Sequence, residues 1–170
     1  QFYECFFTRD ELKPAVVKYV RYGCNKGANV CPDITSKYGW PMNSWCVGNV
    51  TDMSGLFYEM RSFNDDISSW DVSQVRSMYQ MFNFATSFNG DLSSWDVSRV
   101  QNMDRMFSGA SSFNGDLSLW DVSQVQDMNH MFWSATLFNG DLSSWDVSQV
   151  QDMSSMFSWA SSFDGDLSSW

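Results

Sequence analysis

The apolar residues of this chain recur with a fixed step of 25 positions. Tryptophan shows the period most clearly, in the series Trp45, Trp70, Trp95, Trp120, Trp145 and Trp170. Rows of valine, methionine and phenylalanine keep the same phase, beginning at Val50, Met53 and Phe63. Such a period predicts a repeat architecture in which each unit completes the core of its neighbours. We divide the chain into an N-terminal cap, residues 1–45, and five units: 46–70, 71–95, 96–120, 121–145 and 146–170.

Each unit has two halves with different patterns. The first half, exemplified by DVSQVQDM, is short, rich in serine and partly alternating, which is typical of short extended strands and turns. In the second half, apolar residues fall at i, i+3, i+4 and i+7, as at Met78, Met81, Phe82 and Ala85. This spacing predicts one face of a short helix. The expected fold is therefore an α/β repeat solenoid, with one short parallel strand and one short helix in each 25-residue coil.

The cap has a different pattern. Thr8 and Glu11 are spaced as a capping box for a helix over about residues 9–21, and Leu12 and Val20 contribute to its apolar face. Residues 21–44 are expected to form a disulfide-tied loop. We interpret the whole segment as an α-helical, disulfide-tied cap that shields the first coil from water.

All four cysteines lie in the first 46 residues: Cys5, Cys24, Cys31 and Cys46. An even number in a small region predicts two disulfides, with the pairing open among three possibilities. Disulfides are favoured over zinc because there is no CxxC pair and the single histidine, His130, is remote in sequence. Disulfides indicate an extracellular or cell-surface protein, and the sequon at Asn49 predicts a glycosylation site.

Composition argues against several classes of function. The net charge of −10 disfavours nucleic acids and anionic membranes as partners, and no apolar stretch approaches the length of a membrane span. Catalysis finds no support, because the chain has one histidine, cysteines of structural character and no phosphate-binding loop. We therefore expect no enzyme and no cofactor.

Polar residues also form rows with the repeat period. The row Asp71, Asp96, Asp121 and Asp146 could bind calcium, but turn carboxylates more often accept backbone N–H groups. The same reasoning applies to the second aspartate row, which begins at Asp66. The asparagine row that begins at Asn64 is interpreted as an internal ladder that satisfies turn backbone groups.

The segment WDVSQVQDMSSMFSWASSFDGDLSSW resembles the surface-protein repeat of mycoplasma and Listeria lipoproteins, which is grouped with BspA-like leucine-rich repeats. The resemblance covers residues 46–170 and implies a leucine-rich-repeat-like solenoid that is exported and displayed on a surface. It implies no activity. The sequence departs from the pattern at Cys46, where later units have aspartate, which is consistent with a first coil bonded to the cap.

Some positions of the expected helix differ between units. They lie off the methionine and phenylalanine face and, like Asn83 and Asp104, should meet solvent. Phe84, Trp133 and Trp159 place large aromatic side chains among small ones. This predicts either a surface that contacts a partner or rings that fold back over neighbouring helices.

The repeat series stops at Trp170 without a polar cap. We therefore expect an assembly face formed by Met153, Met156, Phe157, Leu167 and Trp170. The first hypothesis is a non-enzymatic extracellular structural protein. Its units stack on a second copy or continue into further repeats, head to tail, as a fibre or cell-surface assembly. The alternative is an adhesion or receptor module that binds a protein or glycan through the variable helix face.

Overall fold

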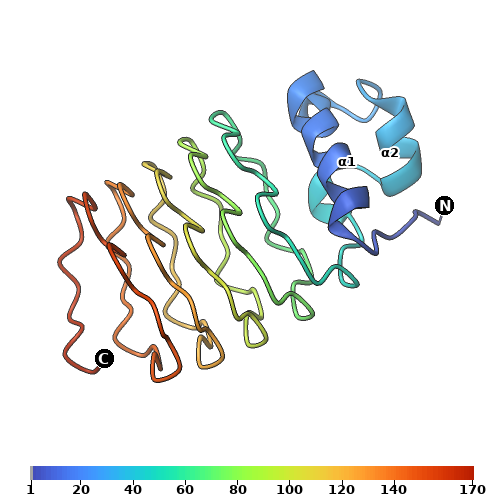
Figure 1. Ribbon diagram of the computed structural model, residues 1–170. Helices are drawn as coiled ribbons and strands as arrows, with labels where there is room; N and C mark the ends of the chain where they lie inside the picture. Colours follow the sequence, from blue (N-terminus) through green and yellow to red (C-terminus); the bar gives the residue numbers. More distant parts are fainter. Residues whose placement is uncertain (1) are drawn as a thin grey trace.

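The computed structural model describes residues 2–170, and all its helices lie in the cap. Their order is α1 (Arg9–Tyr22), η1 (Cys24–Lys26), α2 (Pro32–Tyr38) and η2 (Met42–Ser44). The repeat units follow as a row of similar loops, with α1 and α2 at one end and the C-terminus at the other (Figure 1). The cap therefore contacts the first unit and leaves the sides of the stack open.

Helix α1 begins with the capping box at Thr8 and Glu11. The Glu11 carboxylate accepts the backbone N–H groups of Phe7 and Thr8, which holds the pKa of Glu11 below its ordinary value. The helix ends where Gly23 adopts a left-handed backbone, with φ of 68°. Helix α2 lies within the segment expected to be a loop, and its short sequence PDITSKY has too few apolar positions to predict a helix.

Two disulfides tie the cap together. Cys24 pairs with Cys31 between α1 and α2, and Cys5 pairs with Cys46. The second bond joins the N-terminal segment to the first repeat unit. This is the pairing that the sequence left open.

The expected leucine-rich-repeat-like α/β solenoid is wrong. Residues 46–170 contain no helix and no named strand. The strand-like pairing between neighbouring units consists of isolated parallel β-bridges, each formed by one pair of residues: Asp52 with Ser77, Ser77 with Asn102, Asn102 with Asp127, and Asp127 with Asp152. Each unit is instead built from successive tight turns.

The turns explain why the sequence pattern suggested a helix. Met81 N–H donates to the Met78 carbonyl, and Ala85 N–H donates to the Phe82 carbonyl, so each bond closes a four-residue turn. The third residue of each turn is left-handed, as type II turns require, with φ of 55° at Gln80 and 57° at Phe84. The first and last residues of two such turns are buried at the same spacing as one face of a helix. Periodicity alone cannot separate these two structures.

The turns also direct alternate N–H groups toward the next unit. In unit 71–95, Met78, Gln80, Phe82 and Phe84 donate to carbonyls of unit 96–120 at 2.8–2.9 Å. The same four bonds recur at every junction between units, with lengths of 2.7–2.9 Å. These bonds give the buried N–H groups of each unit a carbonyl acceptor in the next unit, which buried N–H groups require.

Aromatic side chains form continuous ladders through the interior. The Phe107 ring lies 5.5 Å from Phe82 in the preceding unit and 5.7 Å from Phe132 in the following unit, in stacked geometry. It also stacks on Phe113 of its own unit at 4.0 Å. Each ring is thus held within its unit and between units.

Tryptophans add a hydrogen bond to this packing. The indole N–H of Trp120 donates to the Leu92 carbonyl of the preceding unit at 3.0 Å. The same bond recurs at Trp95, Trp145 and Trp170. These hydrogen bonds therefore fix the position of each repeat unit's core side chains relative to the preceding unit.

The cap completes the first unit with cationic side chains. Arg9 Nε donates to the Ser54 carbonyl at 2.5 Å, and Lys13 Nζ donates to the carbonyls of Gly55 and Leu56 at 2.5 and 2.9 Å. In later units the carbonyls equivalent to Ser54 and Leu56 accept N–H groups from the preceding unit. Burial lowers the pKa of Lys13 to about 8. Arg9 and Lys13 therefore take the place of a preceding unit.

We expect Phe107→Ala to lower the free energy of unfolding by about 3–5 kcal/mol, because it removes a buried ring from the middle of two stacks. Phe157→Ala, in the half-buried outermost layer, should cost clearly less. Urea unfolding followed by circular dichroism compares the two variants. Equal losses would contradict a ladder in which each layer supports both neighbours.

Candidate functional site

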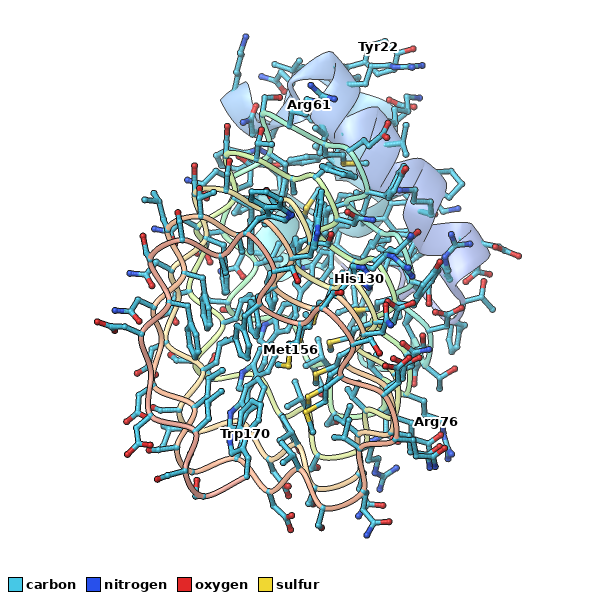
Figure 2. All side chains as sticks on the ribbon, turned by 60° about the vertical axis from the view of Figure 1, so that its left-hand side comes forward. Tyr22, Arg61, Arg76, His130, Met156 and Trp170 are labelled. Carbon is cyan, nitrogen blue, oxygen red and sulfur yellow. A yellow bond between two sulfur atoms is a disulfide. The ribbon has the colours of Figure 1, made fainter. Side chains whose placement is uncertain are left out.

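Two rows of left-handed residues run across the units on one side of the stack. The first row contains Gly55, Gln80, Arg105, His130 and Ser155. The second contains Glu59, Phe84, Gly109, Ser134 and Trp159. We call these rows, with the residue that precedes each member of the second row, the turn face. In Figure 2, His130 of this face lies between Arg61 and Arg76, on the side away from Trp170.

The turn face combines backbone strain with sequence diversity. A left-handed backbone costs a residue with a Cβ roughly 1–2 kcal/mol relative to glycine. Even so, glycine occupies only Gly55 and Gly109, and the other positions include glutamine, arginine, histidine and two large aromatics. The buried rows of valine, methionine and phenylalanine scarcely change between units. The diversity is thus concentrated where the fold itself favours glycine.

A hollow of about 380 Å³ lies in this face and spans four units. Its walls are Tyr58, Gln80, Asn83, Phe84, Arg105, Ser108, His130 and Trp133. The Phe84 ring lies over Gly109, where any Cβ would overlap with it. The same ring meets Trp133 edge to face, with centroids 6.5 Å apart.

The three predicted contact aromatics are therefore separated. Phe84 and Trp133 are half-buried and share the hollow, whereas Trp159 lies outside it and is 76% exposed. The variable residues were expected on one face of a helix. They lie on the turn face instead, because the segment that carries them is not helical.

Asn83 and Asp104, expected to meet solvent, are buried at 2% and 8% exposure. Within residues 2–170, Asn83 Oδ1 is a buried side-chain oxygen without a hydrogen-bond partner. Burial raises the pKa of Asp104, and the Arg105 guanidinium opposes that shift. Arg105 Nη1 contacts both Asp104 oxygens, at 2.7 and 3.0 Å. The hollow is thus lined by aromatic rings, by an amide whose buried oxygen lacks a donor, and by an arginine whose charge is already paired.

The aspartate rows accept local backbone hydrogen bonds. Asp71, Asp96, Asp121 and Asp146, the calcium candidates, each accept the N–H of the serine two residues later at 3.0–3.1 Å. The row that begins at Asp66 makes the same contact at 2.9 Å. In residues 2–170, no group of three or more histidine, cysteine or acidic side chains is arranged to hold a metal ion.

The asparagine row links neighbouring units. Asn64 Oδ1 accepts the N–H of Asn89 at 2.8 Å, and this bond repeats along the row as far as Asp164. These side chains are exposed, so the ladder lies at the surface and not inside as expected. A further row that the sequence analysis missed, Asp52, Asn102, Asp127 and Asp152, also accepts the N–H two residues later. The signal was present as a polar residue directly before the conserved methionine position.

The predicted assembly residues Met153, Met156, Phe157, Leu167 and Trp170 line one hollow of about 460 Å³. Figure 2 looks onto this end of the stack, with Met156 and Trp170 inside the outline of the last unit. Within residues 2–170, the N–H groups of Met153, Ser155 and Phe157 have no hydrogen-bond acceptor. Asn49, the predicted glycosylation site, is exposed.

The structure defines a disulfide-capped repeat protein whose units are built from tight turns. Residues 30–136 and 115–170 match the family described as "Mycoplasma protein of unknown function, DUF285", and the chain belongs to this family. The match supports the predicted likeness to a surface-protein repeat family; the leucine-rich-repeat type is not supported by the turn-built units. No curated protein and no solved structure matches the chain. Across residues 2–170, no helix has the length and apolar character needed to cross a bilayer.

We expect Ser134→Gly to raise the free energy of unfolding by about 0.5–1 kcal/mol, because Ser134 has φ of 56° and glycine adopts this backbone without strain. The matched control is Ser158→Gly in the next unit, whose φ is not left-handed; it should destabilise by a similar amount. Urea unfolding measures both variants. Destabilisation by Ser134→Gly would contradict the strain assigned to the turn face.

The aspartate turns predict acid sensitivity. Hydrogen bonds from the serine two residues later lower the pKa of Asp91, Asp116 and Asp141. Their contribution to stability is therefore complete above the ordinary aspartate pKa of about 3.9, and it is lost as the pH falls through the lowered native values.

The triple variant Asp91→Asn, Asp116→Asn, Asp141→Asn retains the accepting oxygens but does not titrate. Its melting temperature should fall less steeply than that of the parent between about pH 5 and pH 2. Differential scanning calorimetry across this range makes the comparison. Identical acid profiles would show that these turns do not set the acid sensitivity.

Proposed function

We propose that this protein is a non-enzymatic recognition module, displayed outside the cell, whose turn face binds a partner molecule. The observation that carries the proposal is the presence of bulky, dissimilar side chains at left-handed positions. Residues such as Gln80, Phe84 and Arg105 occupy backbone conformations that glycine adopts more easily. Retained strain of this kind is typical of functional sites.

The architecture supports this assignment because it separates the scaffold from the contact surface. Backbone bonds and aromatic ladders hold the units in register without using the side chains of the turn-face rows. Those side chains are consequently free to differ from unit to unit. Repeat proteins use such extended, sequence-tolerant faces to bind partners.

An extracellular or cell-surface location is part of the proposal. The disulfides Cys5–Cys46 and Cys24–Cys31 are of the kind that persists in oxidising environments. The likeness to a surface-protein repeat family points the same way.

Head-to-tail assembly is the second candidate, supported by the apolar side chains that line the hollow on the last unit. The N–H groups there would need carbonyl acceptors equivalent to those of unit 46–70. In another copy of this chain, Arg9 and Lys13 already bind two of those carbonyls, at Ser54 and Leu56. Stacking of copies would therefore require displacement of a disulfide-tied cap, whereas binding at the turn face requires no rearrangement. We rank recognition first for this reason.

The test compares wild-type protein with a variant that carries Gln80→Gly, Phe84→Gly, Arg105→Gly and His130→Gly. Glycine suits the left-handed backbone at all four positions, so the variant should remain folded. Labelled protein is applied to arrays of defined oligosaccharides and of peptides. We expect wild-type protein to bind a restricted set of probes, and the variant to lose at least tenfold in affinity for them, about 1.4 kcal/mol.

The control variant carries Arg76→Ala, Arg99→Ala, Gln101→Ala and Gln124→Ala, which line a separate polar hollow. It should bind the same probes as wild-type protein. Equal losses in the two variants, or no binding by wild-type protein, would overturn the proposed function.

A further inference from the structure

We infer that the hollow in the turn face binds a neutral oligosaccharide across units 46–70 to 121–145. The inference rests on the proposed recognition function and specifies its ligand. It follows from three properties of the hollow: its rings, its unpaired acceptor and its balanced charge.

The aromatic rings suit the C–H faces of sugar rings. Tyr58 is 39% exposed at one end of the hollow, and Phe84 and Trp133 lie in its wall as an edge-to-face pair. Gly109 provides the space for the Phe84 ring, so the ring lies along the face and bridges to the next unit. Rings that are half-buried and locked in this way provide apolar contact area at low entropic cost.

Asn83 indicates that a ligand in the hollow should supply a hydrogen-bond donor. Its Oδ1 atom is buried, lacks a partner within residues 2–170, and belongs to a side chain in the wall of the hollow. A buried acceptor of this kind costs free energy until a donor reaches it. A sugar hydroxyl is such a donor, and the planar groups of Gln80 and Arg105 nearby can bond further hydroxyls on the same ring.

The charge of the hollow favours a neutral ligand. Arg105 is the one lysine or arginine among the lining residues, and Asp104 pairs with it at 2.7 Å. An anionic ligand would have to compete with that buried carboxylate and approach a chain of net charge −10. A cationic ligand finds no unpaired carboxylate in the walls.

The length of the hollow favours an oligosaccharide over a single sugar. The lining residues come from four successive units, whose strand-like spacing of about 4.8 Å gives a span of roughly 14 Å. The ligand would therefore lie along the stack, crossing one layer after another.

The experiment titrates the full chain with neutral hexasaccharides of glucose, mannose and galactose, in α and β linkage, by isothermal titration calorimetry. At least one is expected to bind in the sub-millimolar range. Asn83→Leu should weaken that binding about tenfold, the loss that corresponds to one hydrogen bond. The same substitution should raise the melting temperature, because it replaces an unpaired buried polar group with an apolar one of similar size.

Weaker binding together with a higher melting temperature would show that Asn83 acts in binding. If Asn83 were structural, the substitution would lower the melting temperature. The matched control, Gln124→Leu at an exposed amide outside the hollow, should leave affinity unchanged. Binding of a peptide at the turn face with no neutral hexasaccharide bound would overturn the sugar inference and leave the recognition function standing. If Asn83→Leu bound the sugar as well as wild-type protein, the assignment of this hollow would be wrong.

Discussion

The structure depends on one constraint, the left-handed residue at the third position of each turn. With Gln80 and Phe84 in this conformation, the N–H groups at alternate positions all point toward the next unit. The units are thereby joined by backbone bonds although they contain almost no regular strand. The phenylalanine and tryptophan ladders pack in the same register as those bonds.

The bonds between units at the turns also have a direction, and this gives the two ends of the stack different chemistry. The first unit presents carbonyls, so the cap covers them with the donors of Arg9 and Lys13. At the other end, the N–H groups of Met153 and Phe157 have no acceptor within residues 2–170. The two ends are complementary in principle, but the cap blocks one of them. For this reason head-to-tail stacking of copies requires rearrangement at the capped end, whereas the sides of the stack are accessible as they stand.

Much of this organisation could be predicted from sequence, and the errors have a physical cause. The 25-residue period, the buried rows and the capping box at Thr8 follow directly from residue spacing. The helix expected around Met78 and Ala85 was wrong because paired four-residue turns bury the same positions as a helix does. Glycine at positions 55 and 109 was the available signal, since it marks left-handed backbone in two of the units. The buried state of Asn83 could not be read from the sequence, because the expected helix placed this position off the apolar face.

The candidate site follows from the same constraint. The aromatic ladders restrict which side chains fit at interior positions. The aspartate side chains accept hydrogen bonds within turns, and the asparagine side chains accept hydrogen bonds from the next unit. The turn face alone holds positions whose side chains the fold does not need and whose backbone would favour glycine. In both left-handed rows, each residue other than glycine carries a conformational cost. Four of the eight non-glycine residues in these rows line one hollow, which also contains Asn83: Gln80, Phe84, Arg105 and His130. The conformational cost at these four positions supports the proposal of a ligand that the units carrying them share.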